Sequence, residues 1–277
     1  MKNQGEIEKL VPSSYDIIGS IAIVELPEGI KLRSKLAREI GQAILARHKN
    51  VKTVLAKASA RYGKFRLRKL RLIAGENRSV TLHKENKLLL KLNVRKVYFS
   101  PREQTERLRI ANEINEFFPH GLNLAMVFFA GIGCYPLLIA KRCKVRRVVG
   151  IELNPVAVKY FKENLKLNKV KNCIVIHGDV AREARKFRNA CDVVVMPYPE
   201  GAYRYLKEAF SCLKNNGICF FYAISEEKDL FNRWKAYIAR VAEKQNCRVR
   251  FLRERRVLPY APRKYKVMIC FRLLKGQ

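Results

Sequence analysis

From Ser100 onward, apolar strand-like segments alternate with amphipathic helix-like segments, and this alternation constrains the fold more than any other feature of the sequence. The expected strands cover residues 124–130, 146–153, 172–179, 191–198, 217–224 and 265–274, and the expected helices cover residues 100–118, 136–143, 155–168, 202–213 and 227–245. Strands that alternate with helices in this way build a parallel sheet with helices on both faces. We therefore predict an α/β fold with a doubly wound parallel sheet.

Before that point the pattern is different. Residues 15–26 indicate a short strand with a glycine turn, and apolar residues at helical spacing predict a helix over residues 31–48. Four later segments alternate apolar with polar residues: 52–58, 64–75, 79–86 and 87–99. Such alternation predicts a small antiparallel sheet. The chain is thus expected to consist of a small α+β domain, residues 1–95, and a larger doubly wound domain, residues 96–277.

The composition favours a polyanionic partner. Lys and Arg number 57 against 24 Asp and Glu, which gives a formal net charge of +33. Phosphate backbones are the commonest soluble polyanions, so a nucleic acid is the expected partner. A general Lys/Arg bias of the source proteome is the alternative explanation of this charge.

No stretch of the sequence has the length and apolarity of a membrane span, and the N-terminus lacks the apolar core of a secretion signal. We therefore expect a cytoplasmic protein with no membrane partner. The eight cysteines form no CxxC pair and cluster near no histidine, so no metal site is expected. Most of them lie in apolar runs, where we expect reduced and buried thiols.

A glycine turn followed by two acids indicates a nucleotide site. Gly131 and Gly133 follow an expected strand, where the missing Cβ atoms let backbone N–H groups approach a ligand. Glu152 ends the next strand and can accept hydrogen bonds from ribose hydroxyls. Asp179 ends the third strand and can accept one from an adenine amino group. The alternative is an ordinary tight turn, with Glu152 merely beside a helix cap at Asn154.

The choice of cofactor depends on one further position, because dinucleotide and S-adenosylmethionine sites share the glycines and the first acid. The third position of the dinucleotide fingerprint requires a small residue for close packing of helix on strand. This chain has Pro136 there. The proline disfavours a dinucleotide, and Asp179 fits S-adenosylmethionine better.

Several segments in the same order resemble one family: SYDIIGSIAIVELP, FRLRKLRLIAGENRSVTLHKEN, KVYFSPREQTERLRIA, FAGIG, NPVAVKYFKENLKLNKV and MPYPEGAYRYLKEAF. They are similar to the archaeal and eukaryotic tRNA (guanine-37-N1) methyltransferases, a family that includes the related enzymes of wyosine synthesis. The similarity runs from about residue 13 to the C-terminus. It implies a class I methyltransferase domain with a Rossmann-like sheet, preceded by a small domain that positions RNA.

The resemblance also implies an activity. Family members transfer a methyl group from S-adenosylmethionine to N1 of guanosine at position 37 of tRNA, within the anticodon stem-loop. We expect the same reaction here, from a monomer. Many members carry a further N-terminal domain that docks on the tRNA elbow. This chain is expected to lack it, so that surface charge would hold the outer corner of the tRNA.

Site residues follow by motif matching. The resemblance implies that the cofactor contacts Tyr98, Ala130, Gly131, Gly133, Glu152 and Asp179. It implies Glu106 as the general base and Arg66 beside the target base, with Arg68 less favoured. N1 of guanine must lose a proton as it attacks the methyl group, and a guanidinium can stabilise the charge that builds on O6. Without the resemblance, Glu106 would be a partner of Arg109 on a solvated helix face, and Arg66 one more charge on an exposed strand.

Three features depart from the family pattern. Val127 stands where the family has an aspartate that can hold the methionine end of the cofactor. In the MPYPEG loop, a catalytic segment, Pro197 replaces an asparagine and Pro199 keeps the second proline. Pro197 has neither N–H nor amide to bind the target base, and it resembles the archaeal bifunctional branch that also methylates C7 of 4-demethylwyosine. Residues 112–123 form a longer segment than usual, which can displace Glu106.

Other interpretations stay open. An aminocarboxypropyl transferase of the same superfamily uses the same cofactor but transfers its other carbon chain. A tRNA-binding protein with a decayed catalytic site fits the changes at Val127 and Pro197. Residues 254–267, rich in Arg, Lys and Tyr, suit phosphate contact or form a solvated hairpin. Tyr98 or Tyr198 can stack on a base splayed out of the anticodon loop, or can belong to the core.

Overall fold

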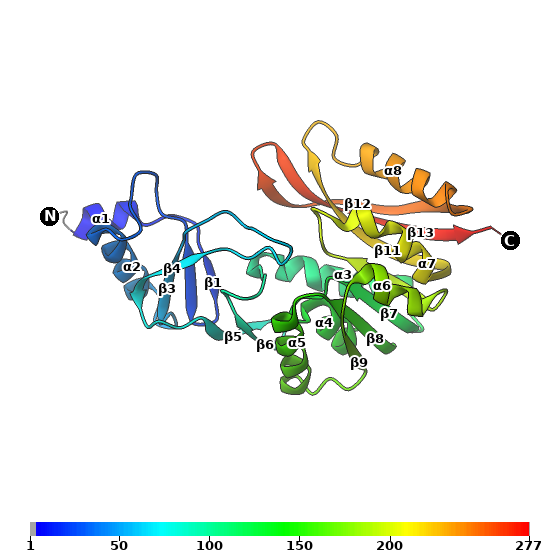
Figure 1. The fold of residues 1–277 in the computed structure, drawn as a ribbon, viewed down its shortest axis with the longest axis horizontal. Coiled ribbons are helices and arrows are strands. Elements are labelled where there is room, and N and C mark those ends of the chain that lie inside the picture. Colours follow the sequence, from blue (N-terminus) through cyan, green and yellow to red (C-terminus); the bar gives the residue numbers. More distant parts are fainter. Residues whose placement is uncertain (1–3, 277) are drawn as a thin grey trace. The chain divides into compact units, whose positions relative to one another are not determined.

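The computed structural model describes residues 4–276 and divides the chain into two compact units, Met1–Thr105 and Glu106–Gln277 (Figure 1). Each unit has its own hydrophobic core. The predicted assignment of residues 1–95 to RNA positioning and of residues 96–277 to methyl transfer concerns function and stays a prediction. Within the described residues, no helix has both the length and the apolar character that crossing a bilayer requires.

The N-terminal unit begins with two helices and a four-stranded sheet. Its elements are α1 (Gln4–Leu10), β1 (Asp16–Ile18), β2 (Ile21–Val24), α2 (Lys35–Arg47), β3 (Thr53–Lys57) and β4 (Leu70–Gly75), and the strand order is β1-β2-β3-β4. α2 follows a cap at Ser34, whose side chain accepts a hydrogen bond from the N–H of Ala37 at 3.1 Å. Ala37, Ile40 and Ile44 form the buried face of α2 and belong to the core of this unit.

Strand pairing in this unit differs from the prediction. The expected antiparallel pairing is found between β3 and β4, but β3 also pairs in parallel with β2, to which it is joined through α2. In addition, β5 (Val80–Glu85) and β6 (Leu88–Asn93) form a separate two-stranded sheet. Asn86 and Lys87, both with positive φ, make the two-residue turn between them. Alternation identifies strands, but pairing depends on contacts between segments that are distant in the sequence.

A tight turn joins the two sheets of the N-terminal unit. Gly19, between β1 and β2, has φ +56°, and its N–H donates to Nδ1 of His83 in β5 at 3.2 Å. The N–H of Ser20 donates to Oγ1 of Thr81 at 2.9 Å. A Cβ on Gly19 would lie 2.4 Å from the carbonyl oxygen of Leu82. This turn therefore needs glycine both for its backbone angle and for the close approach of β5.

The C-terminal unit is a seven-stranded sheet with helices on both faces. Its strands are β7 (Leu122–Phe128), β8 (Val145–Glu152), β9 (Cys173–His177), β10 (Cys191–Met196), β11 (Leu213–Glu226), β12 (Cys247–Ala261) and β13 (Lys264–Lys275). Its helical segments are α4 (Cys134–Arg142), α5 (Pro155–Leu167), α6 (Val180–Glu183), η2 (Ala184–Phe187), η3 (Ala202–Tyr205), α7 (Leu206–Cys212) and α8 (Asn232–Glu243). The segments η1 (Pro101–Glu103) and α3 (Gln104–Phe117) span the boundary between the units.

The strand order β12-β13-β11-β10-β7-β8-β9 confirms the predicted α/β, doubly wound sheet. The strands from β9 to β11 are parallel, whereas β13 is antiparallel to β11 and β12 is antiparallel to β13. Successive residues of a strand face opposite sides of a sheet. Phe221 of β11 accordingly packs in one core with Phe210 of α7 and Ile238 of α8, whereas Phe220 meets Phe117 of α3 on the other face.

The order of the strands reverses between β7 and β10. In open α/β sheets, ligands bind outside the carboxyl ends of the strands at this point of reversal. The glycine turn follows β7, Glu152 ends β8, Asp179 follows β9 and the MPYPEG loop follows β10. The fold thus gathers at one edge the segments in which the sequence predicts a cofactor site.

β12 is a strand that the sequence analysis missed. The residues expected to suit phosphate contact or to form a solvated hairpin, 254–267, form the end of the β12–β13 hairpin, with Arg263 at φ +54° in its turn. β12 lies at the edge of the sheet and alternates only weakly between buried and exposed positions. An edge strand pairs with one neighbour only and can contain few apolar residues. The many charged residues of β12 therefore gave no strand pattern in the sequence.

All eight cysteines are free thiols, of which six are buried, while Cys173 and Cys247 are half-buried. Burial raises the pKa of Cys143 and Cys173 to about 12, which makes them poor nucleophiles at neutral pH. This agrees with the expectation of reduced thiols in apolar surroundings. In the part of the chain that the structure describes, no group of three or more His, Cys, Asp or Glu residues could hold a metal ion.

Replacing Gly19 with alanine is expected to destabilise the N-terminal unit by about 3 kcal/mol or more, because strain at positive φ adds to a collision with the backbone of Leu82. Gly29→Ala is the matched control. Gly29 has φ +83°, but a Cβ there meets nothing within 4 Å, so only strain of about 1 kcal/mol is expected. Denaturant unfolding measures both changes, and equal losses would contradict the proposed close approach.

Candidate active site

Three residues of the turn after β7 lie in the left-handed region: Phe129 (φ +55°), Gly131 (φ +59°) and Gly133 (φ +93°). Gly133 precedes α4, and a Cβ there would lie 2.2 Å from the ring of Phe161 in α5. Glycine is therefore required at this position for the packing of α4 on α5. Gly131 instead faces open space, with no atom within 4 Å of an added Cβ. Its backbone is thus open to the approach of a ligand.

Glu152 connects this turn to β8. Its Oε2 accepts a hydrogen bond from the N–H of Gly131 at 2.8 Å, and its Oε1 accepts one from the N–H of Asn154 at 2.7 Å. The N–H of Ala130 adds a bond to the carbonyl of Ile151 at 2.9 Å. Burial raises the pKa of Glu152, and the N–H groups of Asn154 and Gly131 offset this only in part. A carboxylate has about four acceptor sites, so Glu152 can still accept a hydrogen bond from a ribose hydroxyl.

Two helix caps occur at the predicted acids: Asn154, two residues after Glu152, and Asp179 itself. Asn154 caps α5, where its Oδ1 accepts from the N–H of Val156 at 3.0 Å. Asp179 caps α6, where its Oδ1 accepts from the N–H of Ala181 at 2.9 Å, and its side chain is exposed. Burial and then the charge of Asp179 raise the pKa of Tyr205. The cap at Asn154 does not use the carboxylate of Glu152. The cap at Asp179 uses one of about four acceptor sites of its carboxylate, so Asp179 can also bind a ligand.

The MPYPEG loop is closed by its own backbone. The carbonyl of Tyr198 accepts from the N–H of Gly201 at 3.1 Å and from that of Ala202 at 2.8 Å. A Cβ on Gly201 would lie 2.3 Å from the ring of Tyr198, so the ring packs directly on this glycine. Pro197 is half-buried and Pro199 is buried. The loop therefore presents a fixed surface at the carboxyl end of β10.

Phe129 connects the glycine turn to this loop. Its ring centroid lies 5.1 Å from that of Tyr198 and 5.0 Å from that of Tyr205, both in edge-on geometry. These three rings form an aromatic wall between the carboxyl ends of β7 and β10. Tyr198 was expected from the sequence as a stacking residue, whereas Phe129 and Tyr205 were not. The available signal was the phenylalanine that opens FAGIG, whose backbone angle cannot be read from the sequence.

Val127, which replaces the family's aspartate, is fully buried in β7. Its partners in the neighbouring strands are Gly150 of β8 and Val195 of β10. A valine suits this apolar position at the centre of the sheet. The effect of this departure on cofactor binding stays a prediction.

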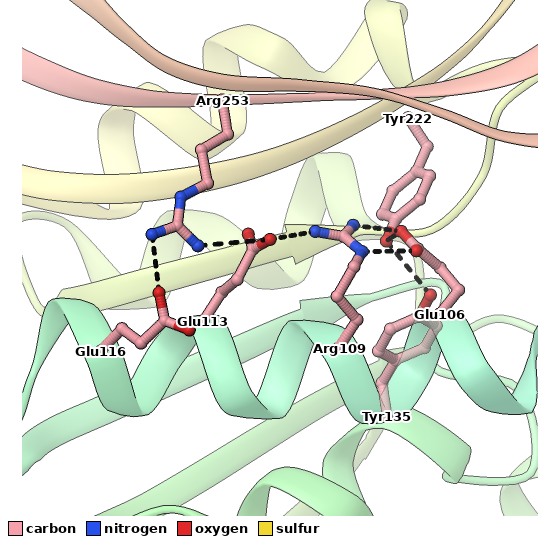
Figure 2. Close-up of polar contacts among 7 residues, drawn as sticks. All are labelled: Glu106, Arg109, Glu113, Glu116, Tyr135, Tyr222 and Arg253. Carbon is pink, nitrogen blue, oxygen red and sulfur yellow. Dashed lines mark hydrogen bonds and ion pairs between the residues drawn. The ribbon is translucent and has the colours of Figure 1, made fainter.

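Glu106 lies in the first turn of α3 and is only 6% exposed (Figure 2). Arg109 donates from Nε to Oε2 at 2.7 Å and from Nη2 to Oε1 at 2.5 Å, and the hydroxyl of Tyr222 in β11 donates to Oε1 at 2.5 Å. The hydroxyl of Tyr135 in α4 donates to that of Tyr222 at 3.3 Å. The ion pair considered from the sequence therefore exists, but the expectation of a solvated helix face is wrong, because α3 packs this side against the sheet.

A chain of ion pairs continues from Arg109 along α3 to β12 (Figure 2). Arg109 pairs with Glu113, and Arg253 of β12 pairs with Glu113 at 3.4 Å and with Glu116 at 2.6 Å. Both glutamates belong to residues 112–123, the segment expected to be longer than usual. This segment thus adds anchoring contacts to α3, the helix that carries the proposed base.

The protonation of this network follows from burial and charge. Burial opposes the charge on Arg109, but the hydrogen bonds that Arg109 donates to Glu106, followed by the charges of the neighbouring groups, outweigh burial and raise the pKa of Arg109. Burial raises the pKa of Tyr222 well above its ordinary value, and the nearby carboxylate adds to the shift. Tyr222 is therefore a protonated donor at neutral pH, and Arg109 is a permanent cation.

Two predicted residues of the N-terminal unit contact each other. The guanidinium of Arg66 lies 4.7 Å from the ring centroid of Tyr98, and that of Arg61 lies 4.5 Å from it. Arg66 is half-buried at φ +54° in a turn closed by its N–H and the carbonyl of Gly63 at 3.0 Å, so the alternative of an exposed strand position is wrong. Burial and the charge of Arg61 lower the pKa of Arg68. Sequence analysis did not identify Arg61.

Comparison with known proteins covers both units. A model described as the TRM5/TYW2 methyltransferase domain matches residues 81–250, which is more than half of the chain, and a model described as the TYW2 N-terminal domain matches residues 2–78. The chain belongs to the TRM5/TYW2 methyltransferase family. The resemblance inferred from the sequence, including its archaeal branch, is thereby confirmed.

Two relatives of this TRM5/TYW2 family member have named activities. The tRNA (guanine(37)-N(1))-methyltransferase Trm5b of Pyrococcus abyssi is 40% identical over 268 residues, which span 97% of this chain and 77% of the relative. The tRNA (guanine(37)-N(1))/4-demethylwyosine(37)-methyltransferase Taw22 of Nanoarchaeum equitans is 43% identical over 176 residues, which span 64% of this chain and 55% of the relative.

Three solved structures of the family carry relevant ligands. A complex of aTrm5 with tRNALeu has 31% identity and a TM-score of 0.78, covering 96% of this chain and 73% of that one. The P. horikoshii TYW2 in complex with MeSAdo has 29% identity and a TM-score of 0.81, covering 98% of this chain and 95% of that one. S-adenosylmethionine itself is bound in the M. jannaschii TYW2 structure, which has 26% identity and a TM-score of 0.72, covering 95% of this chain and 100% of that one.

Acidification is expected to weaken the binding of S-adenosylmethionine to this family member. Because the pKa of Glu152 is raised from 4.5, its carboxylate is protonated at a higher pH than an ordinary one and then loses acceptors for the ribose hydroxyls. Affinity, measured by isothermal titration calorimetry, should fall as the pH is lowered, and the fall should begin at a higher pH than for an ordinary carboxylate. Glu152→Gln should bind about tenfold or more weakly at neutral pH and lack this pH dependence; an equally steep profile in the variant would contradict the assignment.

Tyr222→Phe is expected to destabilise the C-terminal unit by about 1.5–3 kcal/mol, because it removes a hydrogen bond to a buried carboxylate. Tyr135→Phe is the matched control, since its hydroxyl donates to Tyr222 at 3.3 Å and leaves the bonds to Glu106 in place. Thermal unfolding compares the two variants. A larger loss of stability in Tyr135→Phe than in Tyr222→Phe would contradict the expectation that the hydrogen bond from Tyr222 to Glu106 contributes more than the one from Tyr135 to Tyr222.

Proposed function

We propose that this protein transfers the methyl group of S-adenosylmethionine to N1 of the guanosine at position 37 of tRNA. The observation that carries the proposal is the carboxyl edge of the sheet, where Glu152 ties an open glycine turn to β8. This edge occurs in a chain that is 40% identical, over 97% of its length, to a tRNA (guanine(37)-N(1))-methyltransferase.

The residues at that edge fit S-adenosylmethionine. Gly131 offers open backbone, Glu152 offers two acceptor oxygens for the ribose, and Asp179 offers an exposed carboxylate for the adenine amino group. Tyr205 of the aromatic wall offers a ring for the adenine to stack on. When bound, this cofactor supplies an electrophilic methyl group on its sulfonium sulfur.

Glu106 is the carboxylate that we propose as the acceptor of the N1 proton. Among the described residues, its Oε1 has two donors, whereas Oε2 has one, the Nε of Arg109. Oε2 is therefore the oxygen with more room for a further proton. Arg109 and Tyr222 fix the orientation of the carboxylate, so that a base held by the enzyme meets it in one geometry.

Arg66 is the guanidinium that we propose beside O6 of the target base. Its contact with the ring of Tyr98 restricts its orientation, and Arg61 on the same ring adds positive charge. Negative charge builds on O6 as N1 loses its proton, and a preorganised guanidinium stabilises that charge. The role predicted for Tyr98 at the cofactor remains part of this proposal.

The proposed substrate is a tRNA, bound by a monomer through the anticodon stem-loop. The net charge of +33 supports a polyanionic substrate. A relative bound to tRNALeu supports the same class of RNA. Position 37 lies in a loop, so the base must leave its stack to reach the carboxyl edge of the sheet.

A second activity is favoured by Pro197. The proline supplies no amide and no N–H at the end of β10, whereas a carbon nucleophile such as C7 of 4-demethylwyosine needs no such partner. The Taw22 relative carries both activities in its name. Incubation with tRNA-Phe that contains 4-demethylwyosine, followed by nucleoside mass spectrometry, is expected to give a C7-methylated product. Absence of this product would reject the second activity.

Nucleoside mass spectrometry also distinguishes the alternatives. With guanosine at position 37, a methylated product supports the proposal. With tRNA-Phe that contains 4-demethylwyosine, an aminocarboxypropyl product would instead favour the activity named for a tRNA(Phe) (4-demethylwyosine(37)-C(7)) aminocarboxypropyltransferase of Methanocaldococcus jannaschii, which is 29% identical over 255 residues. A decayed catalytic site predicts no product, and calorimetric titration would then detect no binding of S-adenosylmethionine.

Glu106→Gln is expected to lower the single-turnover rate of methylation by about 10²–10⁴-fold, because an amide cannot take the proton. Arg66→Ala is expected to lower it by about 10²-fold. Arg68→Ala, a nearby arginine in the same turn region, is the control and should retain most of the rate. Binding of S-adenosylmethionine to each variant checks that the fold is intact, and wild-type rates in the first two variants would remove both residues from the mechanism.

A further inference from the structure

An open groove of about 630 Å³ lies between η3 and α8 of the C-terminal unit. It is lined by Tyr203 from η3 and by Arg233, Trp234, Tyr237 and Arg240 from α8. The segment η3 directly follows the MPYPEG loop at the carboxyl end of β10, and α8 lies beside β12. The groove therefore adjoins the edge of the sheet at which the proposed reaction takes place, yet none of its residues belongs to the cofactor or catalytic set.

Three aromatic rings form the floor of this groove. Trp234 lies 5.7 Å from Tyr203 and 6.1 Å from Tyr237, measured between ring centroids, and Tyr203 lies 6.1 Å from Tyr237. The indole is anchored from below, because its Nε1–H donates to the carbonyl of Ile224 at 3.0 Å and its ring packs on Phe221. All three rings are half-buried, so they combine a fixed position with an accessible surface.

Three exposed arginines surround these rings. Arg204 lies 5.3 Å from the ring centroid of Tyr203, and Arg240 lies 5.5 Å from that of Tyr237. Arg233 lies 5.5 Å from that of Trp234. Among the described residues, none of the three has a carboxylate within ion-pair distance, in contrast to Arg109 and Arg253 at the network of Glu106. Their charge is therefore available to a ligand.

We propose that this groove binds an unpaired nucleotide of the substrate tRNA, with the base stacked on the rings and the flanking phosphates held by the arginines. Fixed aromatic rings bordered by guanidinium groups are the combination by which proteins bind single-stranded RNA without reading its sequence. Arginine also forms paired hydrogen bonds with phosphate oxygens. The proposal rests on the proposed function in that it takes tRNA as the substrate.

The chemistry favours RNA over an acidic protein segment. Arg204, Arg233 and Arg240 would attract carboxylates as well as phosphates. An acidic peptide, however, offers no planar ring to cover Tyr203 and Tyr237, whereas each nucleotide brings one phosphate and one base. The alternation of guanidinium groups and rings around the groove matches that composition.

Trp234 is the only tryptophan of the protein, so its fluorescence reports on this groove alone. Titration with tRNA is expected to quench the emission to saturation, because a stacked base covers the indole or its neighbours. Polyglutamate of comparable charge is the probe for a protein partner and should leave the emission unchanged. Equal quenching by polyglutamate, or no quenching by tRNA, would overturn the proposal.

The double variant Arg233→Gln/Arg240→Gln removes two guanidinium groups and retains the three aromatic residues, so it tests the phosphate contacts. Its affinity for tRNA should fall about tenfold at moderate salt, and the log–log dependence of affinity on salt should become shallower by about 1.4, or 0.7 for each of two phosphates. The matched control is Arg146→Gln/Arg147→Gln, which removes the same charge from exposed positions near the amino end of β8. Equal losses of tRNA affinity in the two double variants would show that the arginines of the groove act only through the general positive charge, and would overturn the proposal.

Methylation by the wild-type protein, measured by mass spectrometry, separates this proposal from the proposed function. If tRNA quenches Trp234 and the groove variant binds weakly while no methyl group is transferred, the groove stands and the proposed reaction fails. If methylation proceeds and neither the fluorescence nor the groove variant responds, the reaction stands and the groove is rejected.

Discussion

The carboxylate of Glu152 joins the glycine turn after β7 to the cap of α5 after β8, and the geometry of the proposed cofactor site depends on this bridge. A buried carboxylate is costly unless donors satisfy it. Here the donors are backbone N–H groups, whose positions are set by the strands themselves. The bridge therefore fixes the open backbone of Gly131 relative to an acid that still has acceptors to offer. Phe129, in the same turn, packs its ring against Tyr198 in the loop after β10 and so forms part of the aromatic wall.

Glu106 is satisfied in a different way, by side chains from elements far apart in the chain. Arg109 holds it from within α3, Tyr222 holds it from β11, and the pairing of Arg109 through Glu113 reaches Arg253 in β12. Burying a carboxylate is costly unless a paired charge and hydrogen bonds compensate it. Through Arg253, the β12–β13 hairpin thus helps to orient Glu106 at the N-terminal end of α3.

In the proposed complex with tRNA, positive charge and aromatic surface have separate roles. A net charge of +33 attracts RNA at long range and without direction. Rings held by packing provide position, because stacking acts only at contact. The aromatic wall at the carboxyl edge and the groove between η3 and α8 are built from different tyrosines but follow one another along the segment from Tyr198 to Tyr205. Attraction and placement are thus supplied by different side chains.

The sequence by itself determined the features that act between neighbours in the chain. Alternation predicted the parallel strands and the doubly wound sheet, and the glycines and acids after successive strands predicted one nucleotide-binding edge. Tertiary structure alone decided the parallel pairing of β2 with β3, the edge strand β12, and the contact of Arg66 with Tyr98. It also decided the bond between Glu106 and Tyr222, which are separated by 116 positions. Periodicity and turn chemistry are local, whereas burial, ion pairing and ring contacts depend on which distant segments the fold brings together.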